Sequence, residues 1–225
     1  MEKFSPPIED YLKTIYLLRE REGAATTTAI ATALEVTPAS VTGMMKKLAE
    51  LKLVRHTPYQ GVELTKSGEK IALEMVRHHR LLELFLMEAL GYTWDEVHAE
   101  ADVLEHVISE DFEERMAARL GYPTLDPHGA PIPDKDGSIA SVKERALLAM
   151  QTGESAQITH INDTDSAMLR YAASLGLRPH TPLKLIEVEP FGGSLRVKIG
   201  KAEKAIGREL AAQIFVSLEP SSSEK

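Results

Sequence analysis

Hydrophobic residues recur at helical spacing through the first half of the chain. In "SPPIEDYLKTIYLLRERE" (5–22) they return every three or four positions, which predicts an amphipathic helix. A shorter helix is expected in "ATTTAIATALEV". A third is expected in "VTPASVTGMMKKLAELKLV" (36–54), where Thr37 caps the helix and Pro38 takes its first position. Residues 54–68 alternate between apolar and polar side chains around a glycine, which predicts a small hairpin.

Two longer helices are expected next. One runs from about Lys66 to Leu90, and the other starts at the capping box Thr93-x-x-Glu96 and ends near Gly121. The following stretch, "YPTLDPHGAPIPDKDGS", is rich in Pro, Gly and Asp and is typical of a linker. Beyond it come the strand-like patterns "SAQITHI", "PLKLIEVEP" and "SLRVKIG" and one helix, "DTDSAMLRYAASLG", which predict a small, mostly β domain.

One segment of the second long helix carries unusual chemistry. In "VHAEADVLEHVISE" the side chains of His98, Asp102, Glu105 and His106 follow the spacing i, i+4, i+7 and i+8. On a helix these positions share one stripe, beside an apolar stripe that faces a core. Partly buried carboxylates and imidazoles need partners, and a divalent cation is a good one. The alternative interpretation is a solvated acidic surface, the usual explanation of a charge run.

Composition narrows the function classes. The chain has 225 residues and a formal net charge of −8, which argues against non-specific nucleic-acid binding by the whole chain. Acidic residues are concentrated in 71–122, the region that carries the histidine-rich segment. The absence of cysteine excludes disulfides, cysteine catalysis and thiolate metal sites. With no membrane-length apolar run and no signal-peptide pattern at the start, a cytoplasmic protein is expected.

The order helix, helix, Thr/Pro-capped helix and hairpin within some 65 residues predicts a winged helix-turn-helix. Its third helix would enter the major groove of DNA, and its hairpin would touch the DNA backbone. Hydroxyl and lysine side chains there suit phosphates and base edges. The same unit also serves in protein–protein contacts, so that alternative stays open. The candidate DNA contacts are Thr37, Pro38, Ser40, Thr42, Lys46, Lys47 and Tyr59.

Several segments together make the chain resemble the DtxR/MntR family of metal-dependent repressors over nearly its whole length. They are "IEDYLKTIYLL", "VTPASVTGMMKKLAELKLV", "GVELTKSGEKIA", "RHHRLLELFL", "WDEVHAEADVLEHVISEDFEERM" and "GAPIP". The resemblance implies a mainly α fold with a winged-helix domain, a helical dimerisation and metal-sensing domain, and a C-terminal SH3-like (FeoA-type) β-barrel. We expect these at 1–70, 71–122 and 139–225, with a linker at 123–138.

The resemblance also implies the metal ligands. A primary site is expected at Asp10, Asp102, Glu105 and His106, and a second site at His79, Glu83 and His98. Asp165 is a weak further candidate, because an aspartate before a helix more often caps it. Manganese-sensing relatives usually carry a glutamate where this chain has Lys13, a departure from their pattern. His78, Glu113 and the remaining histidines are expected to have no site role, with His78 and Glu113 facing solvent.

The expected function is a Mn²⁺-activated, possibly Fe²⁺-activated, repressor of metal-uptake genes. The expected partners are operator DNA and a second copy of the chain in a homodimer, with no membrane and no small organic substrate. The main alternative is a winged-helix regulator that answers to an organic effector. A metalloenzyme is disfavoured because the sequence has no G-x-S-x-G, P-loop or H-E-x-x-H signature.

Overall fold

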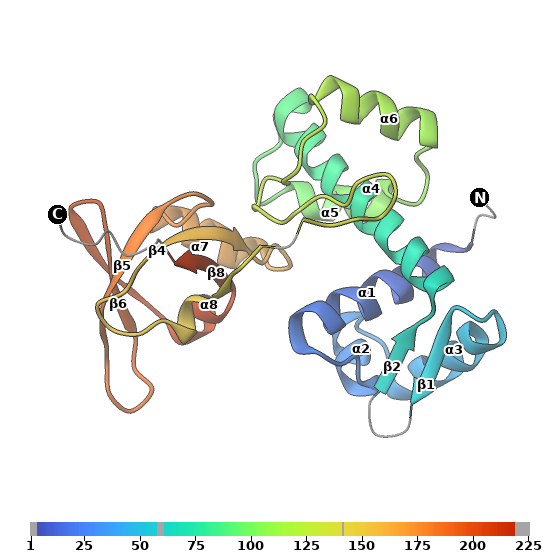
Figure 1. Ribbon diagram of the computed structural model, residues 1–225, viewed down its shortest axis with the longest axis horizontal. Coiled ribbons are helices and arrows are strands. Elements are labelled where there is room, and N and C mark those ends of the chain that lie inside the picture. The colour runs from blue at the N-terminus through green and yellow to red at the C-terminus, as the bar shows by residue number, and fades with distance from the viewer. Residues whose placement is uncertain (1–3, 58–60, 141, 219–225) are drawn as a thin grey trace. The chain divides into compact units, whose positions relative to one another are not determined.

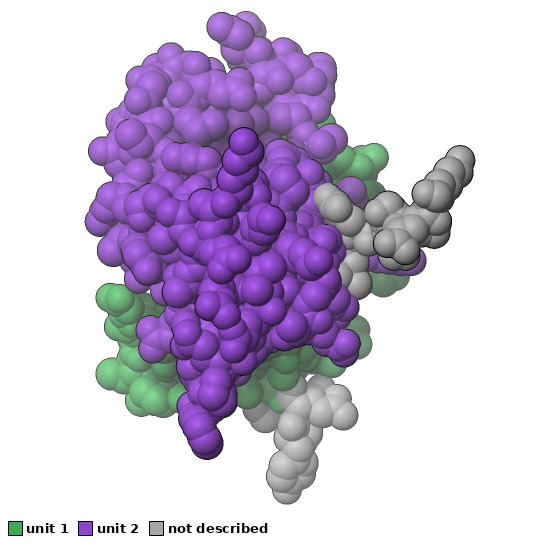
Figure 2. Space-filling view, turned by 90° about the vertical axis from the view of Figure 1, so that its left-hand side faces the viewer, with its two compact units in different colours: residues 1–79, 102–113, 133–138 green, residues 80–101, 114–132, 139–225 purple. Residues whose placement is uncertain are grey.

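The computed structural model describes residues 4–57, 61–140 and 142–218 (Figure 1). The chain divides into two compact units, coloured separately in Figure 2. The first comprises 1–79, 102–113 and 133–138, and the second comprises 80–101, 114–132 and 139–225. Within the described residues, no helix combines the length and the apolar character needed to cross a membrane.

The first unit begins with three helices and a hairpin (Figure 1). The helices are α1 (Pro6–Glu22), α2 (Thr27–Ala33) and α3 (Pro38–Glu50). Strands β1 (Val54–Thr57) and β2 (Gly61–Leu64) pair antiparallel. The predicted winged helix-turn-helix is therefore confirmed, although Tyr59, one of the candidate DNA contacts, lies outside the described residues.

Local sequence explains where these helices start. The Thr37 hydroxyl accepts a hydrogen bond from the backbone N–H of Ser40 at 3.2 Å, and Pro38 occupies the first turn, where no backbone donor is needed. Thr26 caps α2 in the same way. One shared core holds the elements together, since apolar side chains of α1, α2, α3, both strands and the start of the following helix are buried together. Its largest fully buried side chains are Leu12, Ile15, Ile30 and Leu48.

Helices α4 (Lys66–Leu90) and α5 (Val97–Leu104) contribute residues to both units. The single helix expected to end near Gly121 is wrong. It is two helices, α5 and α6 (Glu110–Arg119), with a break over residues 105–109.

The break has a local cause. The Ser109 hydroxyl accepts a hydrogen bond from the backbone N–H of Phe112 at 3.2 Å and so starts α6 as a cap. The preceding Val107 and Ile108 are β-branched and lose side-chain freedom in a helix. Glu105 and His106 therefore lie in a turn, so the helical stripe expected for them does not exist.

The second unit contains a six-stranded antiparallel sheet in the order β3-β8-β4-β5-β6-β7. Its core is formed by buried apolar side chains of the strands together with those of two short helices. One helix, α7, follows β4 in the sequence, and the other, α8, precedes β8. The predicted small β domain is confirmed, with three strands that the sequence patterns did not single out (β3, β7 and β8). The elements are β3 (Arg145–Ala146), η1 (Leu147–Ala149), β4 (Ser155–Ile161), α7 (Ser166–Ser174), β5 (Pro182–Val188), β6 (Leu195–Ile199), β7 (Ala202–Ile206), α8 (Arg208–Ala212) and β8 (Ile214–Leu218).

Candidate metal centres and DNA-binding surface

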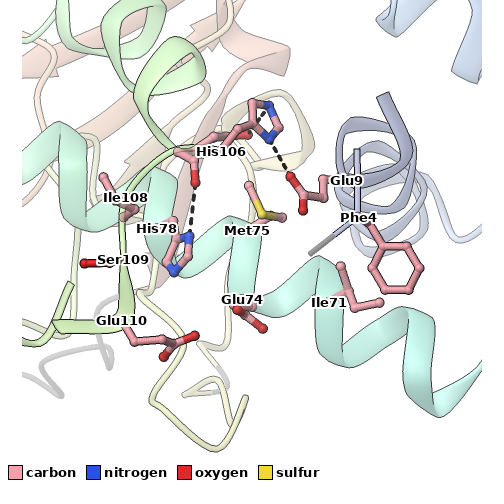
Figure 3. Close-up of a pocket in the computed structure, with 11 residues that line it drawn as sticks. Phe4, Glu9, Ile71, Glu74, Met75, His78, His106, Ile108, Ser109 and Glu110 are labelled. Atoms are coloured by element: carbon pink, nitrogen blue, oxygen red, sulfur yellow. Dashed lines mark hydrogen bonds and ion pairs between the residues drawn. The ribbon is translucent and has the colours of Figure 1, made fainter. Parts of the chain in front are cut away.

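In the first unit, α1 faces the break between α5 and α6 with its polar side chains. The Nε2 atom of His106 lies 2.9 Å from Oδ1 of Asp10, and its Nδ1 atom lies 2.8 Å from Oε2 of Glu9 (Figure 3). Both ring nitrogens of His106 therefore contact carboxylates, one from each of two consecutive residues of α1. Glu9 was not among the predicted site residues.

Glu105 is the buried centre of this cluster, with 2% of its surface exposed. The Nζ atom of Lys13 lies 2.8 and 2.7 Å from its two carboxylate oxygens, and the Nδ1 atom of His79 lies 2.5 Å from Oε2. Lys13 also donates to Oδ1 of Asp102 at 3.0 Å. Asp102 and His79 therefore lie on the Lys13 side of Glu105, while Asp10 and His106 form a separate group with Glu105.

These residues form two groups with the geometry of a metal site. In each group, one ligand atom from every member lies within 4.8 Å of the others. The first group is Asp10, Glu105 and His106, and the second is His79, Asp102 and Glu105, so that Glu105 belongs to both. We call these five residues, together with Glu9 and Lys13, the α1 cluster: Glu9, Asp10, Lys13, His79, Asp102, Glu105 and His106.

Burial and neighbouring charges shift the protonation equilibria within the α1 cluster. Burial raises the pKa of Asp10, and this outweighs the opposing effect of His106. Burial also acts to raise the pKa of Glu105, but the hydrogen bond from His79 and the charge of Lys13 lower it overall. For Lys13, burial acts in the lowering direction, and the carboxylates of Glu105 and Asp102 raise the pKa above its usual value.

The contacts of His106 fit a bound cation. Both ring nitrogens of His106 face carboxylates, which only accept hydrogen bonds, and a neutral imidazole has one N–H to donate. At the other nitrogen, two acceptors face each other and repel unless a proton or a cation lies between them. An imidazole whose second nitrogen donates to a carboxylate is the usual arrangement of a metal-binding histidine.

A cavity of about 220 Å³ opens beside the α1 cluster (Figure 3). Its lining combines apolar side chains with acidic ones, and such a wall suits a cation better than an apolar organic molecule. The residues that line it are Phe4, Glu9, Ile71, Glu74, Met75, His78, Glu105, His106, Ile108, Ser109 and Glu110.

The second unit holds another group of ligand-type side chains, which we call the His128 cluster: Glu83, His98, Asp126, His128 and Asp163. The Nδ1 atoms of His98 and His128 lie 3.2 and 3.5 Å from the two oxygens of the Glu83 carboxylate. Oδ2 of Asp163 lies 3.7 Å from both Nδ1 atoms. Glu83 and His128 are completely buried.

The His128 cluster also fits a cation. Nε2 of His128 donates to the backbone carbonyl of Trp94 at 2.6 Å, which leaves Nδ1 as the nitrogen that faces the carboxylates. Nδ1 of His128 and Oδ2 of Asp126 are buried without a hydrogen-bond partner in the described structure. Such atoms are costly unless a cation or proton compensates them.

The shifted pKa values of His128 and Asp126 also favour a bound cation. Burial alone would lower the pKa of His128, but the carboxylates of Glu83, Asp163 and Asp126 raise it to about 9. Burial and the charge of Glu83 raise the pKa of Asp126 to about 6. The cluster thus holds more negative charge than its buried position favours, and a divalent ion would neutralise it.

The predicted second site, His79, Glu83 and His98, stays a prediction, and one ligand atom from each of these residues and from Asp163 lies within 4.8 Å of the others. Glu83 and His98 also belong to the His128 cluster, and His79, one turn before Glu83 on α4, also contacts Lys13 and Glu105. The Asp165 side chain caps α7 by accepting hydrogen bonds from the backbone N–H groups of Ala167 and Met168. It is Asp163, two residues earlier, that reaches the histidines.

Two expectations about solvent exposure are wrong. His78 and Glu113 are both buried, and Nε2 of His78 lies 3.0 Å from Oε2 of Glu113. Arg77 donates to the other oxygen of Glu113 at 2.5 Å. His128, which was set aside for lack of a partner pattern, is completely buried. Its surroundings, "DPHGAP", have loop composition, so no periodic signal marked it.

The candidate DNA contacts of the third helix are all on the surface. Thr37, Pro38, Ser40, Thr42, Lys46 and Lys47 are exposed around the N-terminal half and outer face of α3. The Thr42 hydroxyl donates to the Pro38 carbonyl at 2.9 Å, one turn earlier. A Cβ placed on Gly43 would meet nothing within 4 Å, so this face is open to a partner.

Known families match three stretches of the chain. Residues 3–62 match the family described as "Iron dependent repressor, N-terminal DNA binding domain", and residues 65–134 match "Iron dependent repressor, metal binding and dimerisation domain". Residues 145–218 match the "FeoA domain".

Full-length relatives and solved structures agree. The chain is 31% identical over 221 residues to the iron-dependent repressor IdeR of Mycobacterium leprae, covering 92% of this chain and 95% of that protein. It is 38% identical over 228 residues to IdeR of Mycobacterium tuberculosis, covering 96% and 99%. A solved "Manganese-dependent transcriptional repressor complex with manganese" has 40% identity and a TM-score of 0.90, covering 94% and 100%. The IdeR structure of T. acidophilum has 31% identity and a TM-score of 0.80, covering 94% and 97%.

The class defined by fold and site is a metal-dependent, DNA-binding transcriptional repressor with a dimerisation domain. The chain belongs to the DtxR/MntR family of iron- and manganese-dependent repressors. This family membership favours a metal ion over an organic molecule as the effector.

Proposed function

We propose that this protein is a Mn²⁺-activated repressor, also responsive to Fe²⁺, that binds operator DNA as a homodimer and controls metal-uptake genes. The observation that carries the proposal is the α1 cluster, in which the His106 imidazole lies 2.9 Å from the Asp10 carboxylate beside the buried Glu105. Carboxylate and imidazole ligands without sulfur suit Mn²⁺ and Fe²⁺. A regulator of this kind needs no catalytic activity, and its DNA partner would place it in the cytoplasm.

The ligands of the activating ion would be Asp10, Glu105 and His106. Asp102 would join them only when its carboxylate turns away from Lys13. The ion supplies positive charge between α1 and the turn at 105–106. Because α1 and α3 share one hydrophobic core, fixing α1 also fixes the helix proposed to enter the major groove. When α1 is fixed in both protomers of the dimer, the spacing of their two α3 helices would fit the two half-sites of the operator.

A second ion is proposed for the His128 cluster. Its candidate ligands form two groups that share Glu83 and Asp163, and one adds His79 and His98 while the other adds Asp126 and His128. Asp163 comes from the loop after β4, so this ion would tie the β domain to α4 and to the loop at 126–130. Its contribution would be to stabilise the second unit.

The test is operator binding by the metal-free protein, titrated anaerobically with Mn²⁺ or Fe²⁺ and followed by fluorescence anisotropy. We expect tight binding only with metal, and loss of metal activation in Glu105→Ala and His106→Ala. Circular dichroism should show that both variants keep their helices. Normal metal-activated binding by either variant would rule out the proposed activating site. Equal binding with and without a chelator would rule out metal activation altogether and favour an organic effector.

A further inference from the structure

Lys13 stands where a metal ion would otherwise fit. Its Nζ atom lies 2.7 Å from Oε2 of Glu105, 3.0 Å from Oδ1 of Asp102 and 3.1 Å from Nδ1 of His79. Only 13% of the Lys13 side chain is exposed. The ammonium group has three donors, and the two oxygens of Glu105 with Oδ1 of Asp102 offer three acceptors.

The same three neighbours are one of the two ligand groups of the α1 cluster. His79, Asp102 and Glu105 place one ligand atom each within 4.8 Å of one another, as a divalent ion requires. A divalent ion at that point would meet the ammonium charge at contact distance and would have to displace it. The group of Asp10, Glu105 and His106 has no such occupant among the described residues.

We propose that Lys13 is the resident cation of the His79–Asp102–Glu105 half of the α1 cluster, so that the wild-type cluster takes one divalent ion instead of two. The inference rests on the proposed function, because it assumes that the other half binds metal. It also gives Lys13 a role in the metal-free protein. The ammonium joins α1 to Asp102 and Glu105, which would otherwise repel each other.

The test is a count of bound Mn²⁺ per chain by equilibrium dialysis at saturating Mn²⁺, with electron paramagnetic resonance on the same samples. The proteins are the wild type, Glu105→Ala, Lys13→Glu, Lys13→Gln and Lys13→Arg. Lys70→Glu is the matched control, because it makes the same charge change at an exposed position of α4. Lys13→Gln decides the outcome if Lys13→Glu does not fold.

We expect Lys13→Glu and Lys13→Gln to bind one ion more than the wild type. The two neighbouring ions share Glu105, so the resonance spectrum should show spin coupling that the wild type lacks. Lys13→Arg and Lys70→Glu should keep the wild-type count, the first because it retains a cation and the second because it is remote from the site.

An unchanged count in both Lys13→Glu and Lys13→Gln overturns the inference. A wild type that exceeds Glu105→Ala by two ions also overturns it, because metal would then displace Lys13. A wild type equal to Glu105→Ala would refute the activating site of the proposed function. In that case a gained ion in Lys13→Glu still supports the role of Lys13, and no gain refutes it.

Discussion

At the residue scale, the role of each histidine depends on what its second ring nitrogen contacts. His106 meets Glu9 with one nitrogen and Asp10 with the other, and His128 donates to the Trp94 carbonyl and turns Nδ1 toward Glu83. His78 instead lies between the backbone carbonyl of Glu105 and the Glu113 side chain, which makes it a structural residue. The partners of both ring nitrogens therefore distinguish the proposed metal-binding imidazoles from the structural one.

The buried group of Glu113, Arg77 and His78 should be a large contributor to stability. We expect Glu113→Ala to lower the free energy of unfolding by about 3 kcal/mol, because removal of one partner leaves buried charge uncompensated. Urea unfolding with a chelator present measures this. Glu88→Ala removes an exposed carboxylate from α4 and should change stability by no more than about 0.5 kcal/mol. Equal effects of the two substitutions would show that the ion pairs contribute nothing.

The effect of Glu113→Gln should depend on pH. Burial acts to raise the pKa of Glu113, but His78 and Arg77 lower it below its ordinary 4.5. Its stabilisation is therefore present above pH 4.5 and is lost as the pH falls through the lowered pKa. Burial acts to lower the pKa of His78, but Glu113 raises it above its ordinary 6.5. That part is present below pH 6.5 and is lost as the pH rises through the raised pKa. The difference in unfolding free energy between wild type and variant should be largest between these two ordinary values, and a pH-independent difference would contradict the assignment.

At the element scale, short non-helical segments position several of the proposed metal ligands. The turn between α5 and α6 carries Glu105 and His106, and the loop at 126–130 carries Asp126 and His128. In that loop Oδ1 of Asp126 accepts hydrogen bonds from the backbone N–H groups of His128 and Ala130, which holds His128 in place. Both segments pack closely against regular elements, so their conformation is fixed by tertiary contacts.

Gly129 should be essential to the loop at 126–130. Its φ is +89°, and a Cβ there would lie 2.0 Å from the Thr159 carbonyl oxygen on β4. We expect Gly129→Ala to weaken Mn²⁺ binding at the His128 cluster by about tenfold, as loss of a supporting interaction does. Calorimetric titration measures this. Gly153→Ala is the control, because Gly153 has a similar φ of +93° but nothing within 4 Å of an added Cβ. Equal losses in both variants would mean that the close approach to β4 is not the cause.

Helix α3 should contact DNA through its exposed lysines. We expect Lys46→Ala and Lys47→Ala each to weaken operator binding and to reduce the slope of log affinity against log salt by about one. Thr42→Ala should instead alter sequence preference, because a threonine at a base edge reads sequence. Lys201→Ala, in the β domain, should leave the slope unchanged. A wild-type slope in both α3 variants would show that another element binds the phosphates.

At the scale of the whole molecule, the α1 cluster and the His128 cluster, the two proposed metal sites, each join segments far apart in the sequence. The α1 cluster links α1 to residues 102–106, and the His128 cluster links α4 to the loop at 126–130 and to Asp163. Cations at these points would act as cross-links, and cross-links between distant segments restrict the unfolded chain most.

A chain that ends at Asp134 should separate the two clusters. It keeps every residue of the α1 cluster and lacks Asp163. We expect it to remain a dimer with metal-dependent operator binding, but to bind one ion fewer per chain than the full-length protein. Asp163→Ala in the full-length chain is the matched variant and should show the same reduced count. Sedimentation shows the oligomeric state, and a monomeric truncated chain would mean that the β domain belongs to the dimer interface.

The sequence by itself determined the regular elements and the family. Helical periodicity, Thr/Pro caps at Thr37 and Pro38, and strand alternation are local signals. The structure confirms the elements they predicted, except the single helix expected to end near Gly121, which is two helices. The same signals placed Asp102, Glu105 and His106 in one short segment, which the structure keeps near Asp10 and Lys13.

Only the tertiary structure decided which side chains meet. Because the helix breaks at 105–109, Glu105 and His106 do not lie on one helical stripe with Asp102. The hydrogen bond from Lys13 holds Asp102 on the side of Glu105 opposite to Asp10 and His106. His128 and Asp163 had no periodic pattern, because their positions follow from how two loops pack on α4 and β4. A local pattern reports the conformation of neighbouring residues, whereas a metal site depends on distances between atoms that are remote in sequence, and only packing of the folded chain fixes those distances.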